Sequence, residues 1–312
     1  MKTISVLKQG LKLTGRASRM IFFLFLLNLL FSLVLAVPMY HIMKDSFGQG
    51  ETAEKMSKGF DYLWWEQFRY RSQGLAKTFS PSIIGKGAIL DNYDYLINMN
   101  LFKLPSAIIT LIFLYILFRT FLAGGILSVY NSSHEKFKMK SFFSGAGVYY
   151  MRFILLMLIS WIFLYLVGIL LNRKLTSILN AVSSISYSEI PSFYLGLLFS
   201  VIILMLFLFI QMVFDYARID VVREERQNAF KSVKKSVHFI IRHPLSTLSV
   251  FYLLFLAGAV FAVVYSFVAE ALPDANFLGV LIGFIVQEIF ILGVIWLRCW
   301  LYAGQMELYR SV

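Results

Sequence analysis

The hydrophobic positions of this chain form long unbroken runs instead of alternating with polar ones. A helix needs about 20 apolar residues to cross a hydrocarbon core about 30 Å thick. Six runs meet that requirement, at 21–40, 104–128, 152–171, 193–214, 246–268 and 277–299. The pattern predicts an all-α, polytopic membrane protein with six transmembrane helices, built as a single membrane domain over residues 1–312.

The first run is predicted to be a retained helix and not a cleaved signal peptide. It exceeds the roughly 7–15 apolar residues of a signal sequence, and its end at Ala36-Val37-Pro38-Met39 lacks the small-x-small cleavage pattern. We therefore count it as the first transmembrane helix.

Lysine and arginine are unevenly distributed between the segments that join these runs. Five occur in 1–20, four in 129–152 and seven in 215–245, but only two in 172–192 and none in 269–276. Short cytoplasmic loops of membrane proteins carry the excess of such cations. The distribution, with an even number of spans, predicts that both termini are cytoplasmic (N-in and C-in).

Segment 215–245 is predicted to contain a cytoplasmic amphipathic helix over 218–242. Its apolar stripe comprises Ile219, Val222, Ala229, Phe230, Val233, Val237, Ile240 and Ile241. Its basic residues are Arg218, Arg223, Lys231, Lys234, Lys235 and Arg242. The helix either docks a protein partner or anionic headgroups, or packs at the interface under the bundle, and the two interpretations are compatible. Residues 2–13 predict a second, shorter interfacial helix.

The 41–103 segment is predicted to form an extracytoplasmic cap, because it is too long for a plain connection and rich in aromatic residues. Within it, Phe60, Trp64 and Phe68 lie at i, i+4 and i+8, which predicts a helix over 51–70. Trp64, Trp65 and Phe68 are the predicted aromatic site residues of the cap. Both a stabilising lid and a ligand cleft are compatible with this composition.

Two glycine-containing segments predict irregular geometry near the membrane surface. Gly124-Gly125 predicts the end of the second span, with a hinge or a close backbone approach as the alternatives. The aromatic and small residues of 141–153 predict an elbow at the cytoplasmic interface.

Composition supports the membrane assignment and changes how the charge is interpreted. Apolar residues make up 59% and charged residues 15% of the 312, and the mean hydropathy is +0.74. A soluble domain could not bury that much apolar surface. The net charge of +12 is assigned to cytoplasmic loops facing anionic headgroups, and not to nucleic acid, since no nucleic-acid-binding motif is present. The single cysteine, Cys299, allows no intrachain disulfide.

Two charged residues lie inside predicted spans. Counted from the outer ends at about 1.5 Å per residue, Glu288 lies roughly 16 Å deep and Arg119 roughly 21 Å. A charge at such depth costs several kcal/mol and needs a partner. We predict an Arg119–Glu288 pair that joins the second and sixth spans, as a structural staple or as a gate. Snorkelling of Arg119 to the cytoplasmic face is the alternative.

The sequence holds no recognisable catalytic motif. Its histidines, His41, His134, His238 and His243, share no metal-ligand spacing, and no P-loop or hydrolase signature occurs. No metal, cofactor or catalytic residue is predicted. The missing motifs favour a protein that is not an enzyme.

Several short strings carry a resemblance to a known group of proteins. They include Phe121-Leu122-Ala123-Gly124-Gly125, Asp215-Tyr216-Ala217-Arg218 and Arg242-His243-Pro244. Together they resemble a family of uncharacterised bacterial six-helix inner-membrane proteins. The later strings are distantly similar to the membrane domain of some glycerophosphodiester phosphodiesterases. The resemblance implies a bacterial inner membrane and no catalytic residues. Asp215 and Arg218 are explained by a local ion pair.

These observations predict a non-enzymatic membrane subunit of a bacterial envelope complex, permease-like or accessory in transport. Its predicted partners are anionic lipids at the cytoplasmic face and other protein subunits, a cytosolic ATPase among them. The alternatives are a membrane-embedded enzyme acting on lipid or lipid-linked substrates from the cap, and a membrane scaffold.

Overall fold

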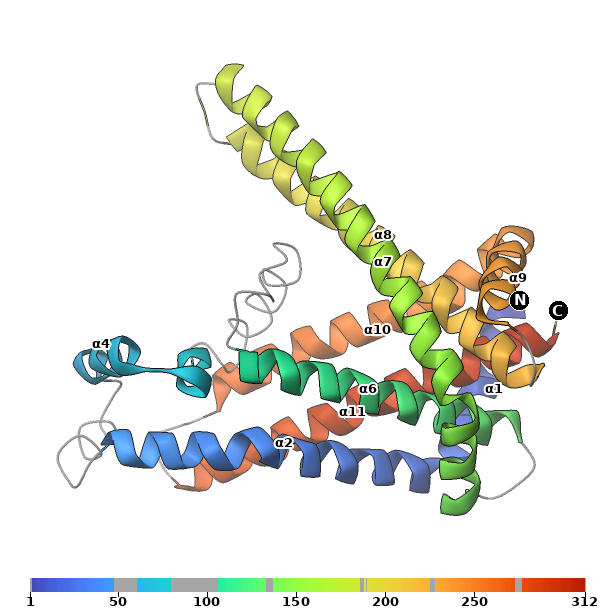
Figure 1. The fold of residues 1–312 in the computed structure, drawn as a ribbon, viewed down its shortest axis with the longest axis horizontal. Coiled ribbons are helices and arrows are strands. Elements are labelled where there is room, and N and C mark those ends of the chain that lie inside the picture. The colour runs from blue at the N-terminus through green and yellow to red at the C-terminus, as the bar shows by residue number, and fades with distance from the viewer. Residues whose placement is uncertain are drawn as a thin grey trace. The chain divides into compact units, whose positions relative to one another are not determined.

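The computed structural model describes residues 2–47, 61–79, 106–132, 137–185, 188, 190–224, 228–272 and 277–311. Every regular element in these ranges is helical (Figure 1). Six helices are long and apolar enough to cross a membrane: α2 (Ser18–Phe47), α6 (Ser106–Asn131), α7 (Met139–Ile185), α8 (Ile190–Arg223), α10 (Pro244–Ala271) and α11 (Phe277–Ser311). The predicted all-α fold with six membrane-crossing helices is confirmed.

Among the described residues, three shorter helices and one 3-10 turn lie between or before these spans. They are α1 (Lys2–Arg16), α4 (Tyr62–Arg71), η1 (Gly74–Thr78) and α9 (Ala229–Arg242). The side chain of Asp61 starts α4 by accepting hydrogen bonds from the amides of Leu63 and Trp64. Asn228 starts α9 in the same way, through the amide of Phe230. The helix predicted over 2–13 is confirmed as α1.

The chain divides into two compact units, which we describe separately. Unit 1 comprises 1–15, 117–252 and 300–312, and unit 2 comprises 16–116 and 253–299. Unit 1 therefore contains α1, α9 and the hairpin of α7 and α8. Unit 2 contains α2, the beginning of α6, most of α10 and of α11, and the described part of the cap.

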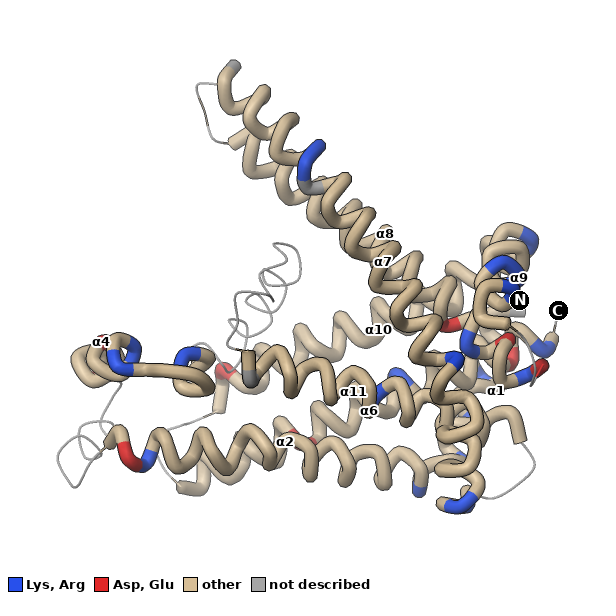
Figure 2. Tube along the Cα trace, in the orientation of Figure 1, with Lys and Arg blue, Asp and Glu red and all other residues tan. Residues whose placement is uncertain are grey.

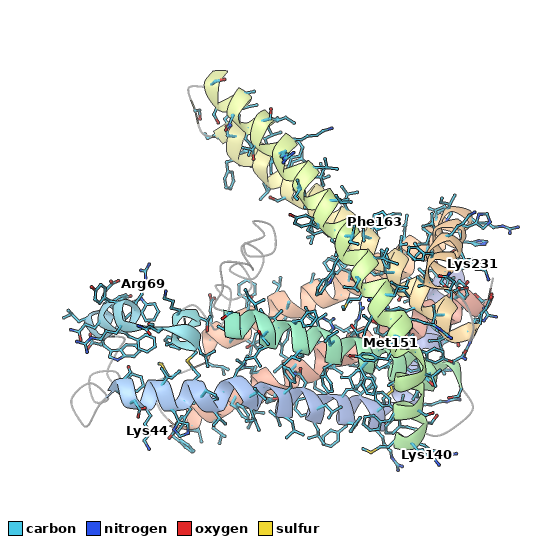
Figure 3. All side chains as sticks on the ribbon, viewed as in Figure 1. Lys44, Arg69, Lys140, Met151, Phe163 and Lys231 are labelled. Atoms are coloured by element: carbon cyan, nitrogen blue, oxygen red, sulfur yellow. The ribbon has the colours of Figure 1, made fainter. Side chains whose placement is uncertain are left out.

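In unit 1 the helices α7 and α8 run side by side (Figure 1). Phe163 packs on Phe214, with ring centroids 6.2 Å apart (Figure 3). The 47 residues of α7 correspond to about 70 Å of helix, more than twice the hydrocarbon thickness. The segment 141–153, predicted to be an elbow, is helical and forms the first turns of α7, which run in a different direction from the rest of that helix (Figure 1).

The first turns of α7 pack against α6 at glycine positions. A Cβ on Gly124 would lie 3.3 Å from the Cα of Ala146, and one on Gly125 would lie 2.6 Å from the ring of Phe142. The helix end predicted at Gly124-Gly125 is wrong, since α6 continues to Asn131. One of the alternatives, a close backbone approach, is confirmed. Small residues at a helix interface permit such contacts within membranes.

Aromatic stacking is the main feature of unit 2. The ring centroid of Phe290 lies 4.0 Å from that of Tyr265 and 5.2 Å from that of Phe261. At the end of α2, Trp64 and Phe68 of α4 are buried together with Ala76 of η1. Trp64 stacks on Phe47 and donates from its indole N–H to Ser46 Oγ at 2.9 Å. In its described part, residues 61–79, the cap is a folded aromatic cluster. The remainder of the predicted cap lies outside the described residues.

Candidate functional site

The end of α8 is enclosed by protein although it carries three charged residues. Every residue from Met212 to Val222 is buried. Asp215 and Asp220 are fully buried and Arg218 is 9% exposed. We call Asp215, Arg218 and Asp220 the buried charge cluster. Removing charged groups from water is costly unless each is paired, so the partners of these three decide how this end of the helix is held.

Each acid of the buried charge cluster is held by its own donors. Arg218 donates to Asp215 Oδ1 at 2.9 Å, and the Gln211 amide donates to the same oxygen at 3.2 Å. The hydroxyl of Tyr309 in α11 donates to Asp220 Oδ1 at 2.8 Å. The local ion pair predicted for Asp215 and Arg218 is confirmed. The partner of Asp220 comes from 89 positions further along the chain, which no local sequence signal indicates.

Further buried polar atoms lie on the helices around this cluster. The Gln305 amide on α11, the hydroxyl of Tyr216 and that of Ser232 on α9 have no hydrogen-bond partner among the described residues. Buried polar groups are normally satisfied. This end of unit 1 is therefore more polar inside than the membrane-crossing parts of its own helices.

Arginines of α8 and α11 join the helix ends of unit 1. Arg223 donates to the carbonyl of Tyr309 at 2.8 Å. Arg310 donates to the carbonyls of Tyr130 and Asn131, at 2.8 and 2.9 Å. These two carbonyls belong to the last turn of α6, where backbone acceptors lack an intrahelical donor and the helix dipole favours a cation. The C-terminal turns of α11 thereby fix the ends of two other helices.

The N-terminal helix packs on this same end of α11. A Cβ on Gly10 would lie only 2.8 Å from the backbone nitrogen of Gly304, so the two backbones are in direct contact. The indole of Trp300 donates to the carbonyl of Leu7 at 2.9 Å. The first and last helices of the chain are therefore in contact within unit 1.

The packed face of α9 consists mainly of small residues. Ala229, Ser232, Ser236 and Ile240 are buried. The ring centroid of Phe239 lies 4.6 Å from that of Tyr309 and 5.3 Å from that of Tyr216. Small side chains let α9 lie close to the helices beneath it, and the aromatic contacts join it to α8 and α11.

The structure corrects the bounds of the predicted amphipathic helix. One continuous helix over 218–242 is wrong, because α8 ends at Arg223 and α9 begins at Ala229. The predicted apolar stripe is divided: Ala229 and Ile240 are buried, whereas Phe230, Val237 and Ile241 are exposed. Ser232 and Ser236 are buried beside Ala229 and Ile240. The face of α9 that packs on the protein is the one with the smallest side chains. Hydropathy alone does not identify this face.

The predicted basic residues fall into two groups. Arg218 is buried in its ion pair, and Arg223 is bound to Tyr309. Lys231, Lys234, Lys235 and Arg242 are exposed on α9. Figure 2 shows cations gathered on α9 and at neighbouring helix ends of unit 1, whereas the outer half of the α7–α8 hairpin carries one blue band, from Arg173 and Lys174 of α7. Lys231 extends outward from α9 (Figure 3).

One of these lysines ties α9 to the end of α8. Lys235 Nζ lies 2.8 Å from both carboxylate oxygens of Glu224. The hydrogen bond to Glu224 raises the pKa of Lys235 above its usual 10.5. A raised lysine pKa stabilises the fold below pH 10.5, and the contribution is lost as the pH rises above that value.

We therefore expect the stability difference between the wild-type protein and Lys235→Met to depend on pH. The difference should be constant between about pH 7 and 9.5 and should diminish as the pH rises above 10.5, where the lysine loses its proton. It should be small, since exposed ion pairs contribute little. Thermal unfolding in detergent across this range measures it. Lys231→Met, which removes an exposed lysine without an ion pair among the described residues, should show no such pH dependence.

The remaining predicted site residues are not members of the buried charge cluster. Arg119 is an exposed residue of α6 in unit 1, and Glu288 is a half-buried residue of α11 in unit 2. Their pairing stays a prediction. Trp64, Trp65 and Phe68 belong to the aromatic cluster of the cap. Within the described ranges, no group of three or more His, Cys, Asp or Glu residues has a metal-binding arrangement.

Comparison with known proteins returned no relatives: no protein-family model, curated protein or solved structure matches the chain. The structure establishes the class, a multi-pass helical membrane protein with six membrane-crossing helices. The resemblance drawn from the short sequence strings stays a prediction.

Proposed function

We propose that this chain is a non-enzymatic membrane subunit of a bacterial envelope complex, with an accessory or permease-like role in transport. Its partner is a cytosolic protein with an acidic surface, such as an ATPase subunit. The observation that carries the proposal is the outward basic sector of α9, Lys231, Lys235 and Arg242, which lies opposite the packed face of that helix.

The basic sector is suited to docking because the helix beneath it is fixed. A helix advances by about 100° per residue, so Lys231, Lys235 and Arg242 lie within about 40° of one another. Neither Lys231 nor Arg242 has an ion-pair partner in the described part of the chain. Exposed charges of one sign steer a complementary surface and select its orientation.

The proposed orientation has both termini and α9 in the cytoplasm. It is supported by the cation distribution along the sequence and by the contact of α1 with the end of α11, which brings the two terminal helices together in unit 1. An even number of membrane crossings agrees with this contact.

The docking proposal is tested by crosslinking in native membranes. A photo-crosslinking amino acid replaces His238, an exposed residue next to the basic sector. We expect one stoichiometric, acidic cytosolic protein to be captured. Lys231→Glu with Arg242→Glu should lower its yield about tenfold, the effect of losing roughly 1.4 kcal/mol from two reversed charges.

The matched control is Arg69→Glu with Arg71→Glu, which reverses two exposed cations of α4 in the cap. This control should leave the yield unchanged. The proposal fails if no stoichiometric partner is captured, or if the α9 and α4 variants lower the yield equally.

A further inference from the structure

A second surface of α9 lies between its packed face and its basic sector. Phe230 and Ile241 are 62% and 71% exposed, and Val237 is also exposed. At about 100° per residue these three positions fall within about 40° of one another. We call Phe230, Val237 and Ile241 the apolar stripe of α9. Each of them leaves at least 39% of its surface exposed in the described structure, so the stripe favours an apolar environment outside the chain.

The N-terminal helix α1 has the same division into three sectors. Val6, Gly10 and Thr14 form its packed face. Ile4 and Leu11 are exposed, at 62% and 41%, and Lys12 lies beyond them. Around each helix the order is the same: packed face, exposed apolar residues, cations. The arrangement therefore occurs twice in unit 1, on helices from distant parts of the sequence.

Both helices adjoin a membrane-crossing helix. Only Ala17 separates α1 from α2, and only His243 separates α9 from α10. The first turn of α10 continues the exposed apolar surface, because Leu245 is 81% exposed. Neither α1 nor α9 is among the helices capable of crossing a membrane. Each is therefore held within a few residues of the bilayer surface without entering the bilayer core.

We infer that α1 and α9 lie in the plane of the leaflet next to unit 1, with their apolar stripes among the acyl chains. The occupant of these surfaces is the lipid bilayer. Helices of this kind bury their apolar face about 5–10 Å into the boundary between headgroups and acyl chains. Lys234 and Lys8 border the two stripes and lie at the level of the phosphates, where anionic headgroups stabilise them. The basic sector of α9 then faces the cytosol.

This inference concerns a different surface from the proposed docking sector and does not depend on it. Its test uses the full chain alone in lipid nanodiscs, with Cys299→Ala to remove the buried native cysteine. Single cysteines at positions 230, 237 and 241, and at the matched positions 231 and 238, carry a spin label. Collision with oxygen, which concentrates in the acyl region, is compared with collision with a water-soluble nickel chelate.

We expect labels at 230, 237 and 241 to collide with oxygen several-fold more than with the nickel chelate, and labels at 231 and 238 to show the reverse. Labels at 4 and 11 on α1 should behave like those on the apolar stripe of α9. Equal nickel accessibility at all positions of α9 would overturn the inference. So would exclusion of both reagents at 230, 237 and 241, since a second copy of the chain would then cover the stripe.

A lipid-selectivity measurement tests the role assigned to the bordering lysines. We expect spin-labelled phosphatidylglycerol to associate with the protein more than phosphatidylcholine does. Lys8→Gln with Lys234→Gln should reduce that preference by several-fold, given the strength of attraction of a lysine to an anionic surface. Arg69→Gln with Arg71→Gln is the control, and an equal loss in this control would contradict the assignment.

Discussion

Asp215→Ala should lower the free energy of unfolding by about 3–5 kcal/mol, one of the two largest effects that we expect. The substitution leaves the guanidinium of Arg218, which is 9% exposed, without the carboxylate that holds it at 2.9 Å. Breaking a buried pair in this way costs more than the pair itself contributes, because one charge stays in the interior uncompensated. Denaturant or thermal unfolding of the purified protein in detergent measures the loss.

A double variant separates the charge from the space that the side chains occupy. Asp215→Val with Arg218→Met removes both charges and retains much of the volume. Apolar replacement of a whole buried pair is often neutral or stabilising, so the double variant should be more stable than Asp215→Ala alone. Additive destabilisation by the two substitutions would show that the charges are not coupled and would contradict the geometry.

Gly10→Leu should detach α1 from the end of α11. A Cβ at this position would lie 2.8 Å from the nitrogen and 2.9 Å from the Cα of Gly304, and backbone atoms of a helix cannot move aside cheaply. Inserting even small groups into a packed contact costs about 1–3 kcal/mol, and a leucine forces the helices apart. The hydrogen bond from Trp300 to Leu7 is then lost as well.

Hydrogen exchange of residues 2–16 measures this detachment, and we expect the protection of their amides to fall sharply. The same helix provides a matched control, because Gly15 has no atom within 4 Å of the position of its Cβ. Gly15→Leu should leave protection unchanged or raise it, since leucine favours helix more than glycine does. Equal protection in the two variants would mean that α1 and α11 are not in backbone contact.

The helices themselves could be predicted from the sequence because hydrophobic length is a strong signal. Within the described residues, all six predicted spans lie in helices of the structure, and the helix ends differ from the predicted ends by only a few residues except where further turns extend the helix. The longest extension is in α7, which continues from the predicted 171 to Ile185. Polar residues after 171 weaken a hydropathy signal without interrupting the helix, so the sequence pattern underestimates helix length outside the bilayer.

The candidate site could be predicted only in part. Asp215 and Arg218 are three residues apart on one helix, so their ion pair follows from local spacing. The contacts of Tyr309 with Asp220 and of Arg310 with Tyr130 join segments 89 and 180 positions apart. Such contacts depend on how the helix ends meet. For that reason neither Tyr309 nor Arg310 could be singled out from the sequence.

The sequence by itself determined that the chain is an all-helical, six-span membrane protein with a short helix over 2–13 and an amphipathic stretch within 218–242. The structure set the bounds of these two helices at Lys2–Arg16 and Ala229–Arg242. Tertiary structure decided which apolar residues of α9 face protein and which stay exposed. Hydropathy cannot make that distinction, since lipid and a protein interior both favour apolar side chains. Side-chain size makes that distinction when helices pack. Ser232 and Ser236 permit close approach of α9 to its neighbours and are buried, whereas Phe230 and Ile241 remain exposed.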